Sequence, residues 1–129
     1  EWIDLDDVHR WISTCEKEHG GRGNLQCSPA MFNPAVLPRN SMRQLDFRLI
    51  DVEAMCIVYV PRQCRYIALS YVWGRRNQSR LVLTSDNEED LLEPGTLALS
   101  ETQASIPRTI LDAMSVVRKL GESYLWVDS

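Results

Sequence analysis

Three side chains that can bind a metal are spaced along the first part of the chain. Cys15 and His19 are four residues apart and would share a face of a helix, and Cys27 follows after seven intervening residues. Cys56 or Cys64 would then supply a fourth ligand. Zinc sites use four ligands, usually in more tightly spaced pairs. Two half-buried residues on a core-facing helix stripe therefore explain Cys15 and His19 better than a metal site does.

Other reactive side chains fit no familiar catalytic pattern. Ser70 lies in an apolar run without the Gly-x-Ser-x-Gly elbow of a serine hydrolase, and the histidines, His9 and His19, fall in a distant segment. Arg22 lies among glycines, but no strand precedes it and no Lys-Ser or Lys-Thr pair follows, as a phosphate-binding loop would require. The sequence thus disfavours a serine hydrolase and a phosphate-binding loop.

The first element predicted from the sequence is an amphipathic helix. Apolar or semi-apolar residues recur there at alternating gaps of three and four: Leu5, Val8, Ile12, Cys15 and His19. Asp4 can cap the helix, and Gly20 with Gly21 can end it. We interpret residues 1–21 as a helical arm, the Gly- and Pro-rich residues 22–44 as a linker, and residues 45–129 as the main domain.

The main domain begins with a predicted β-hairpin. Leu45, Phe47 and Leu49 alternate with polar residues, which is the period of a half-buried strand, and residues 51–54 can turn the chain into a second strand over 55–60. The nearly continuous apolar run 66–73 indicates a strand covered on both faces.

A second amphipathic helix is predicted over residues 106–120, after a short strand at 81–84 and an exposed loop at 85–95. Pro107 lies in its first turn and Gly121 stops it. Another apolar run, 124–127, follows.

The order strand, helix, strand predicts a right-handed crossover between two parallel strands. The predicted fold class is therefore α/β: a partial, mostly parallel sheet with a crossover helix, preceded by the N-terminal helix and the hairpin. The carboxyl ends of the two strands would meet at one edge, with Trp73, Gly74 and Arg75 beside Asp128. In open α/β sheets, ligands bind at that edge.

Composition is that of one ordinary globular domain. The 129 residues are 44% hydrophobic and 25% charged, and the formal net charge of −4 argues against nucleic-acid binding through a basic face. No apolar run approaches the roughly 20 residues of a membrane-spanning helix. The acidic residues 1–7 do not form a secretory signal, so we expect a cytoplasmic protein whose four cysteines are reduced.

Three blocks of this sequence resemble the fungal heterokaryon-incompatibility (HET) domain in order and spacing. They are Tyr66-Ile-Ala-Leu-Ser-Tyr-Val-Trp-Gly74, then Ser105-Ile-Pro-Arg-Thr-Ile-Leu-Asp-Ala113, then Leu120-Gly with Tyr124-Leu-Trp-Val-Asp-Ser129. The resemblance covers the chain from about Leu45 to its end, including Leu49-Ile-Asp-Val52, and a weaker likeness covers the segment from Trp11 to His19. The family's third block continues into a Leu-Cys-Ile segment that is absent here. The resemblance therefore indicates a fragment truncated within the domain, with at least one sheet edge unpaired.

This resemblance implies an effector of non-self recognition, a form of fungal innate immunity, that triggers programmed cell death, with protein partners or self-association. Because a remote similarity of the family to TIR domains has been proposed, and some TIR domains hydrolyse NAD, it also implies a TIR-like fold and cleavage of the nicotinamide glycosidic bond. NAD would be the substrate, and no cofactor would be required.

Cleavage of that bond needs a carboxylate, a cation for the diphosphate and an apolar or aromatic wall. Asp128 is the candidate catalytic residue, and Trp73, Gly74 and Arg75, with Arg76 and Tyr71 nearby, are candidates for binding. Each also has an ordinary structural explanation: a turn for Asp128, a polar loop for the arginines, and packing for Tyr71. A non-catalytic interaction module and an inactive remnant remain the alternatives.

Overall fold

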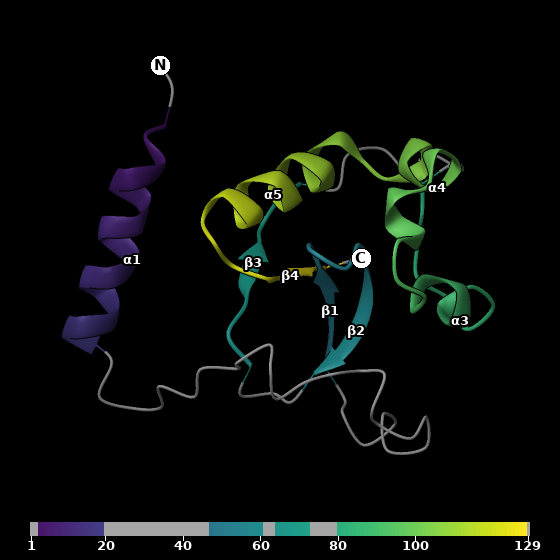
Figure 1. Ribbon diagram of the computed structural model, residues 1–129, viewed down its shortest axis with the longest axis horizontal. Coiled ribbons are helices and arrows are strands. Elements are labelled where there is room, and N and C mark those ends of the chain that lie inside the picture. Colours follow the sequence, from purple (N-terminus) through teal and green to yellow (C-terminus); the bar gives the residue numbers. More distant parts are fainter. Residues whose placement is uncertain (1–2, 20–46, 61–63, 73–79, 129) are drawn as a thin grey trace.

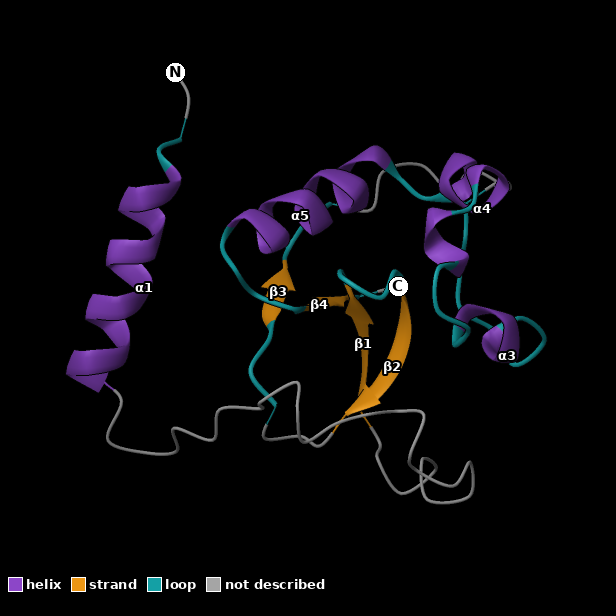
Figure 2. Cartoon of the chain, viewed as in Figure 1, coloured by secondary structure: helices purple, strands orange, loops and turns teal. Residues whose placement is uncertain are grey.

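The computed structural model describes residues 3–19, 47–60, 64–72 and 80–128 (Figure 1). The strands are β1 (Phe47–Asp51), β2 (Cys56–Val60), β3 (Ile67–Leu69) and β4 (Tyr124–Val127). The helical elements are α1 (Leu5–His19), α3 (Glu88–Leu91), the 3-10 turn η2 (Thr96–Ala98), α4 (Ser100–Ser105) and α5 (Arg108–Lys119). Figure 2 shows α1 standing apart from the sheet, while α5 lies across it.

The predicted N-terminal helix is confirmed as α1. A carboxylate oxygen of Asp4 accepts a hydrogen bond from the backbone N–H of Asp6 at 2.9 Å, which is the expected cap. Leu5, Val8 and Ile12 are half-buried along one stripe, whereas Trp11 is 66% exposed. The predicted linker, residues 22–44, falls outside the described residues.

The predicted hairpin is also confirmed. β1 and β2 pair antiparallel from Phe47 opposite Val60 to Asp51 opposite Cys56. The Asp51 carboxylate accepts hydrogen bonds from the backbone N–H groups of Glu53 and Ala54, both at 2.9 Å. This side chain closes the turn because it satisfies two backbone donors that the strands leave unpaired.

The sheet is mixed, so the prediction of a mostly parallel sheet is wrong. Its order is β2-β1-β4-β3, and of the three neighbouring pairs only β3 with β4 is parallel. That pair is the predicted crossover, with α5 between its strands in sequence. The hairpin strand β1 lies on the other side of β4 and pairs with it antiparallel. No local pattern gives the relative direction of two strands so far apart in the chain, so periodicity could not reveal this pairing.

Strand β3 is shorter and more exposed than predicted. The apolar run 66–73 is predicted to be covered on both faces. Of its described residues, 66–72, only Ile67–Leu69 forms a strand, and Tyr66 and Val72 are 40% and 92% exposed. β3 lies at the edge of the sheet, where only β4 pairs with it among the described strands.

Two apolar clusters hold the sheet. One cluster lies under α5 and includes Val52, Met114, Val117 and Leu125, and the other includes Leu49, Cys56, Val60 and Tyr124. Consecutive strand residues Tyr124 and Leu125 belong to different clusters because their side chains point to opposite faces.

The connection from β3 to α5 departs from prediction in three places. The expected strand at 81–84 is an extended segment outside the sheet, in which the backbone N–H of Leu81 donates to the carbonyl of Ser105 at 2.7 Å. The expected loop 85–95 contains α3, which buries Leu91. The third departure is the short helix α4, which was not predicted and precedes α5. The predicted stop of α5 at Gly121 is confirmed, because Gly121 has a positive φ of 70°.

Candidate functional site

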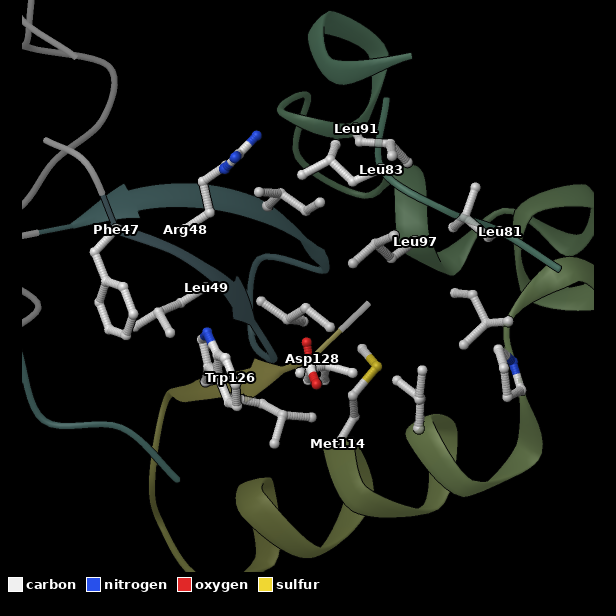
Figure 3. A pocket seen from close by; sticks show the side chains of 17 residues that line it. Phe47, Arg48, Leu49, Leu81, Leu83, Leu91, Leu97, Met114, Trp126 and Asp128 are labelled. Carbon is white, nitrogen blue, oxygen red and sulfur yellow. The ribbon is translucent and has the colours of Figure 1, made fainter. Parts of the chain in front are cut away.

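A cavity of about 330 Å³ lies between the sheet and α5 (Figure 3). Its size falls within the roughly 300–1,000 Å³ of small-molecule pockets. The walls come from β1, β2, β4, the first half of α5 and the segments between β3 and α5. The lining is Phe47, Arg48, Leu49, Ile50, Ile57, Leu81, Leu83, Leu91, Leu97, Ile106, Pro107, Ile110, Met114, Leu125, Trp126, Val127 and Asp128.

Asp128 is the predicted catalytic residue that the structure places at this cavity. It follows β4 directly and is exposed, and Figure 3 shows its carboxylate among the lining side chains. In the parallel register, Leu69 of β3 lies opposite Val127 of β4, so both strands end at the same edge. The other predicted residues of that edge, Trp73, Gly74 and Arg75, fall outside the described residues, as does Arg76.

The second charged side chain at the cavity, Arg48, is already paired. Its Nη1 lies 3.1 Å from Oε1 of Glu88, which also accepts a hydrogen bond from the Tyr59 hydroxyl. The pair ties the hairpin to α3 and offsets the charge of Arg48. Because half of the Arg48 side chain is exposed (51%), solvent screens this ion pair.

Most of the remaining lining residues are apolar in type. Ile110 and Met114 of α5 are buried, and Leu125 of β4 is 1% exposed. Such a wall binds apolar or flat aromatic groups by excluding water, while the carboxylate at the rim can stabilise a positive charge. The cavity can therefore hold an apolar group next to Asp128.

The two polar residues at the end of β3 differ in their surroundings. Tyr71 packs against the cluster under α5, as predicted for a structural residue, and the Arg80 guanidinium carbon lies 5.7 Å from its ring centroid. Arg80 also donates a hydrogen bond to the Tyr71 hydroxyl. Ser70 is exposed.

Cysteines of the described segments provide no metal site by themselves. Cys15 is exposed on α1, so its interpretation as a half-buried residue of a core-facing stripe is wrong. Cys56 and Cys64 are buried, and all three are free thiols. Within residues 3–19, 47–60, 64–72 and 80–128, no group of three potential metal ligands occurs. Cys27 lies outside those segments, so the Cys15, His19 and Cys27 set remains a prediction.

Burial raises the pKa of the Cys56 thiol from 9.0 to about 11, and the nearby charges of Asp51 and Glu93 add to the effect. This thiol is therefore protonated and weakly nucleophilic at neutral pH.

Sequence reasoning missed the part of the cavity that the hairpin supplies. Phe47 and Arg48 were read as strand residues, and the ion pair of Arg48 with Glu88 joins segments 40 residues apart. The alternation in the hairpin was visible, but it could not show which part of the chain would face it.

No helix within the described segments is long and apolar enough to cross a membrane.

Residues 66–129 match the family model described as "Heterokaryon incompatibility protein (HET)". No curated protein and no solved structure matches the chain.

Proposed function

Because residues 66–129 belong to the heterokaryon incompatibility family, we propose that this chain forms part of an effector domain that provokes cell death when incompatible fungal cells fuse. The family match supports a role in heterokaryon incompatibility. Death as the outcome, and the chemistry that causes it, are our proposals. The protein acts in the cytoplasm, where the NAD it consumes is abundant.

The proposed chemistry is hydrolysis of the nicotinamide glycosidic bond of NAD. The bond between ribose C1′ and the ring nitrogen breaks, and its electron pair leaves with nicotinamide. The Asp128 carboxylate stabilises the oxocarbenium-like centre on C1′. Water adds to C1′ and releases a proton to solvent, so the products are nicotinamide and ADP-ribose.

The observation that carries this proposal is the position of Asp128. It is an exposed carboxylate at the end of β4, beside the end of the parallel strand β3, and it lines a cavity whose other lining residues, apart from Arg48, are apolar in type. Ligands of open α/β sheets bind at such an edge. In this proposal, Trp73 and Arg75, which follow β3 in the sequence, bind the base and the diphosphate.

A matched pair of variants tests the catalytic role. We expect expression of the protein in fungal cells to deplete NAD and release nicotinamide before viability falls. Asp128→Ala abolishes both effects. Asp112→Ala, which removes an exposed carboxylate from the outer face of α5, leaves them unchanged.

Death with NAD constant until after viability is lost would reject the enzyme. It would favour a second function, a non-catalytic module that acts by binding protein partners. The exposed apolar surface around β3 supports that alternative, since Val72 is 92% exposed and Tyr66 40%.

A further inference from the structure

The segment 82–94, between β3 and α5, is held in shape by hydrogen bonds of its own. The Asn87 side chain accepts a hydrogen bond from the backbone N–H of Thr84 at 2.8 Å and donates one to the carbonyl of Val82 at 2.9 Å. In the turn of α3, the backbone N–H of Leu91 donates to the Asn87 carbonyl at 3.1 Å. A surface segment bonded in this way can move as one unit.

Both ends of this segment are anchored to the rest of the domain by backbone hydrogen bonds. The N–H of Leu81 donates to the carbonyl of Ser105 at 2.7 Å, and the N–H of Gly95 donates to the carbonyl of Ala54 at 2.8 Å. The segment therefore lies between two fixed points, which is the arrangement that a hinged loop requires.

The segment supplies one wall of the cavity. Leu83 and Leu91 line the cavity, and Leu91 is 4% exposed. In Figure 3, these two side chains lie on the side of the cavity away from Met114 of α5. Asp86 and Glu89 of the same segment are exposed to solvent. The wall is thus a single segment thick, so its displacement would open the cavity to solvent.

The Glu88 carboxylate joins the middle of the segment to the sheet. It accepts a hydrogen bond from the Tyr59 hydroxyl and lies 3.1 Å from Nη1 of Arg48. Tyr59 of β2 and Arg48 of β1 lie opposite each other in the hairpin, so one carboxylate binds a cross-strand pair. Since the Arg48 side chain is half exposed, solvent weakens this contact enough for it to break and re-form.

We propose that residues 82–94 are a lid over the cavity and that the Glu88 carboxylate is its latch. Opening separates Glu88 from the hairpin and takes Leu91 out of the cavity wall, whereas α5 and the sheet stay in place. This inference rests on the proposed function, because the cavity beneath the lid is the one that Asp128 lines, but opening is measured without NAD.

Thiol labelling measures the opening. Leu91→Cys places a thiol beneath the lid. Val117→Cys places one in the same apolar cluster, at a position of α5 that is 1% exposed and does not line the cavity. With iodoacetamide under native conditions, we expect labelling at position 91 to be at least about tenfold faster than at position 117, as peptide mass spectrometry would show. Equal rates would overturn the proposal, because global unfolding alone would then expose both thiols.

The latch is tested in the Leu91→Cys background. Glu88→Ala should raise the labelling rate at position 91 about fivefold, and Tyr59→Phe, which leaves the lid sequence unchanged, about threefold. The matched control, Glu89→Ala, removes an exposed carboxylate from the same helix and should leave the rate unchanged.

An unchanged rate in both latch variants would overturn the role of Glu88. An equal rise at position 117, measured in the Val117→Cys background, would show a loss of global stability and would also overturn the proposal. NAD consumption is assayed separately, so failure of either proposal leaves the other standing.

Discussion

Leu125 joins the two halves of the sheet, so its truncation tests the fold directly. It lies opposite Ile50 of β1 and opposite Ile67 of β3, and its side chain is 1% exposed beneath α5. We predict that Leu125→Ala is strongly destabilising. The exposed residue Leu99, at 58%, provides a control with the same chemical change.

The magnitude follows from burial. Leu→Ala removes three carbons, worth about 0.8 kcal/mol each in transfer free energy, or about 2.4 kcal/mol. The void left behind adds to this cost, because strands on both sides of β4 limit collapse, and the expected loss is about 3–4 kcal/mol. Against a typical stability of about 5–15 kcal/mol, that is a large fraction of the total.

Urea unfolding followed by far-ultraviolet circular dichroism measures the difference. We expect Leu125→Ala to lower the midpoint with an unchanged slope, and Leu99→Ala to stay within about 0.5 kcal/mol of the parent. Equal midpoints for the two variants would show that Leu125 is not buried between β1 and β3, and the described sheet order would be wrong.

Four further predictions concern a surface ion pair, the thiols and a turn. Arg65 binds both carboxylate oxygens of Glu122 and also pairs with Glu16 of α1. Arg65→Gln should therefore speed hydrogen exchange in α1 by a modest factor, because an exposed ion pair contributes at most about 1 kcal/mol. High salt screens the pair, so it should speed exchange in the parent but not in the variant. Iodoacetamide at pH 8 should label Cys15 rapidly and Cys56 only on unfolding, as peptide mass spectrometry would show. Because the pKa of Cys56 is raised in the folded state, its contribution to the free energy of unfolding is complete below pH 9 and should be lost as the pH rises toward 11. A urea-unfolding midpoint that increases between pH 9 and 11 would contradict this prediction. Gly95→Ala should cost about 1–2 kcal/mol in urea unfolding, because φ is +86° there while no atom crowds the added carbon; an unchanged midpoint would argue against that backbone geometry.

The sequence predicted the elements whose signals are local. The gaps of three and four between Leu5, Val8 and Ile12 indicated α1, and the alternation around Phe47 and Leu49 indicated the hairpin. Pro107 and Gly121 marked the limits of α5 to within a residue or two. The parallel pairing of β3 with β4 was also predictable, since a helix that connects two strands of one sheet brings them parallel.

Tertiary structure alone decided how these pieces meet. Antiparallel pairing of β1 with β4, at Ile50 with Leu125 and Asp51 with Tyr124, depends on contacts between segments far apart in the chain. Such contacts produce no periodic pattern in the sequence, because an apolar strand residue can pack beside a parallel or an antiparallel neighbouring strand equally well. The sequence by itself determined an α/β chain with Asp128 after its last strand. Only packing put that carboxylate at an apolar cavity, because three-dimensional proximity, and not spacing in the chain, sets which surfaces enclose it.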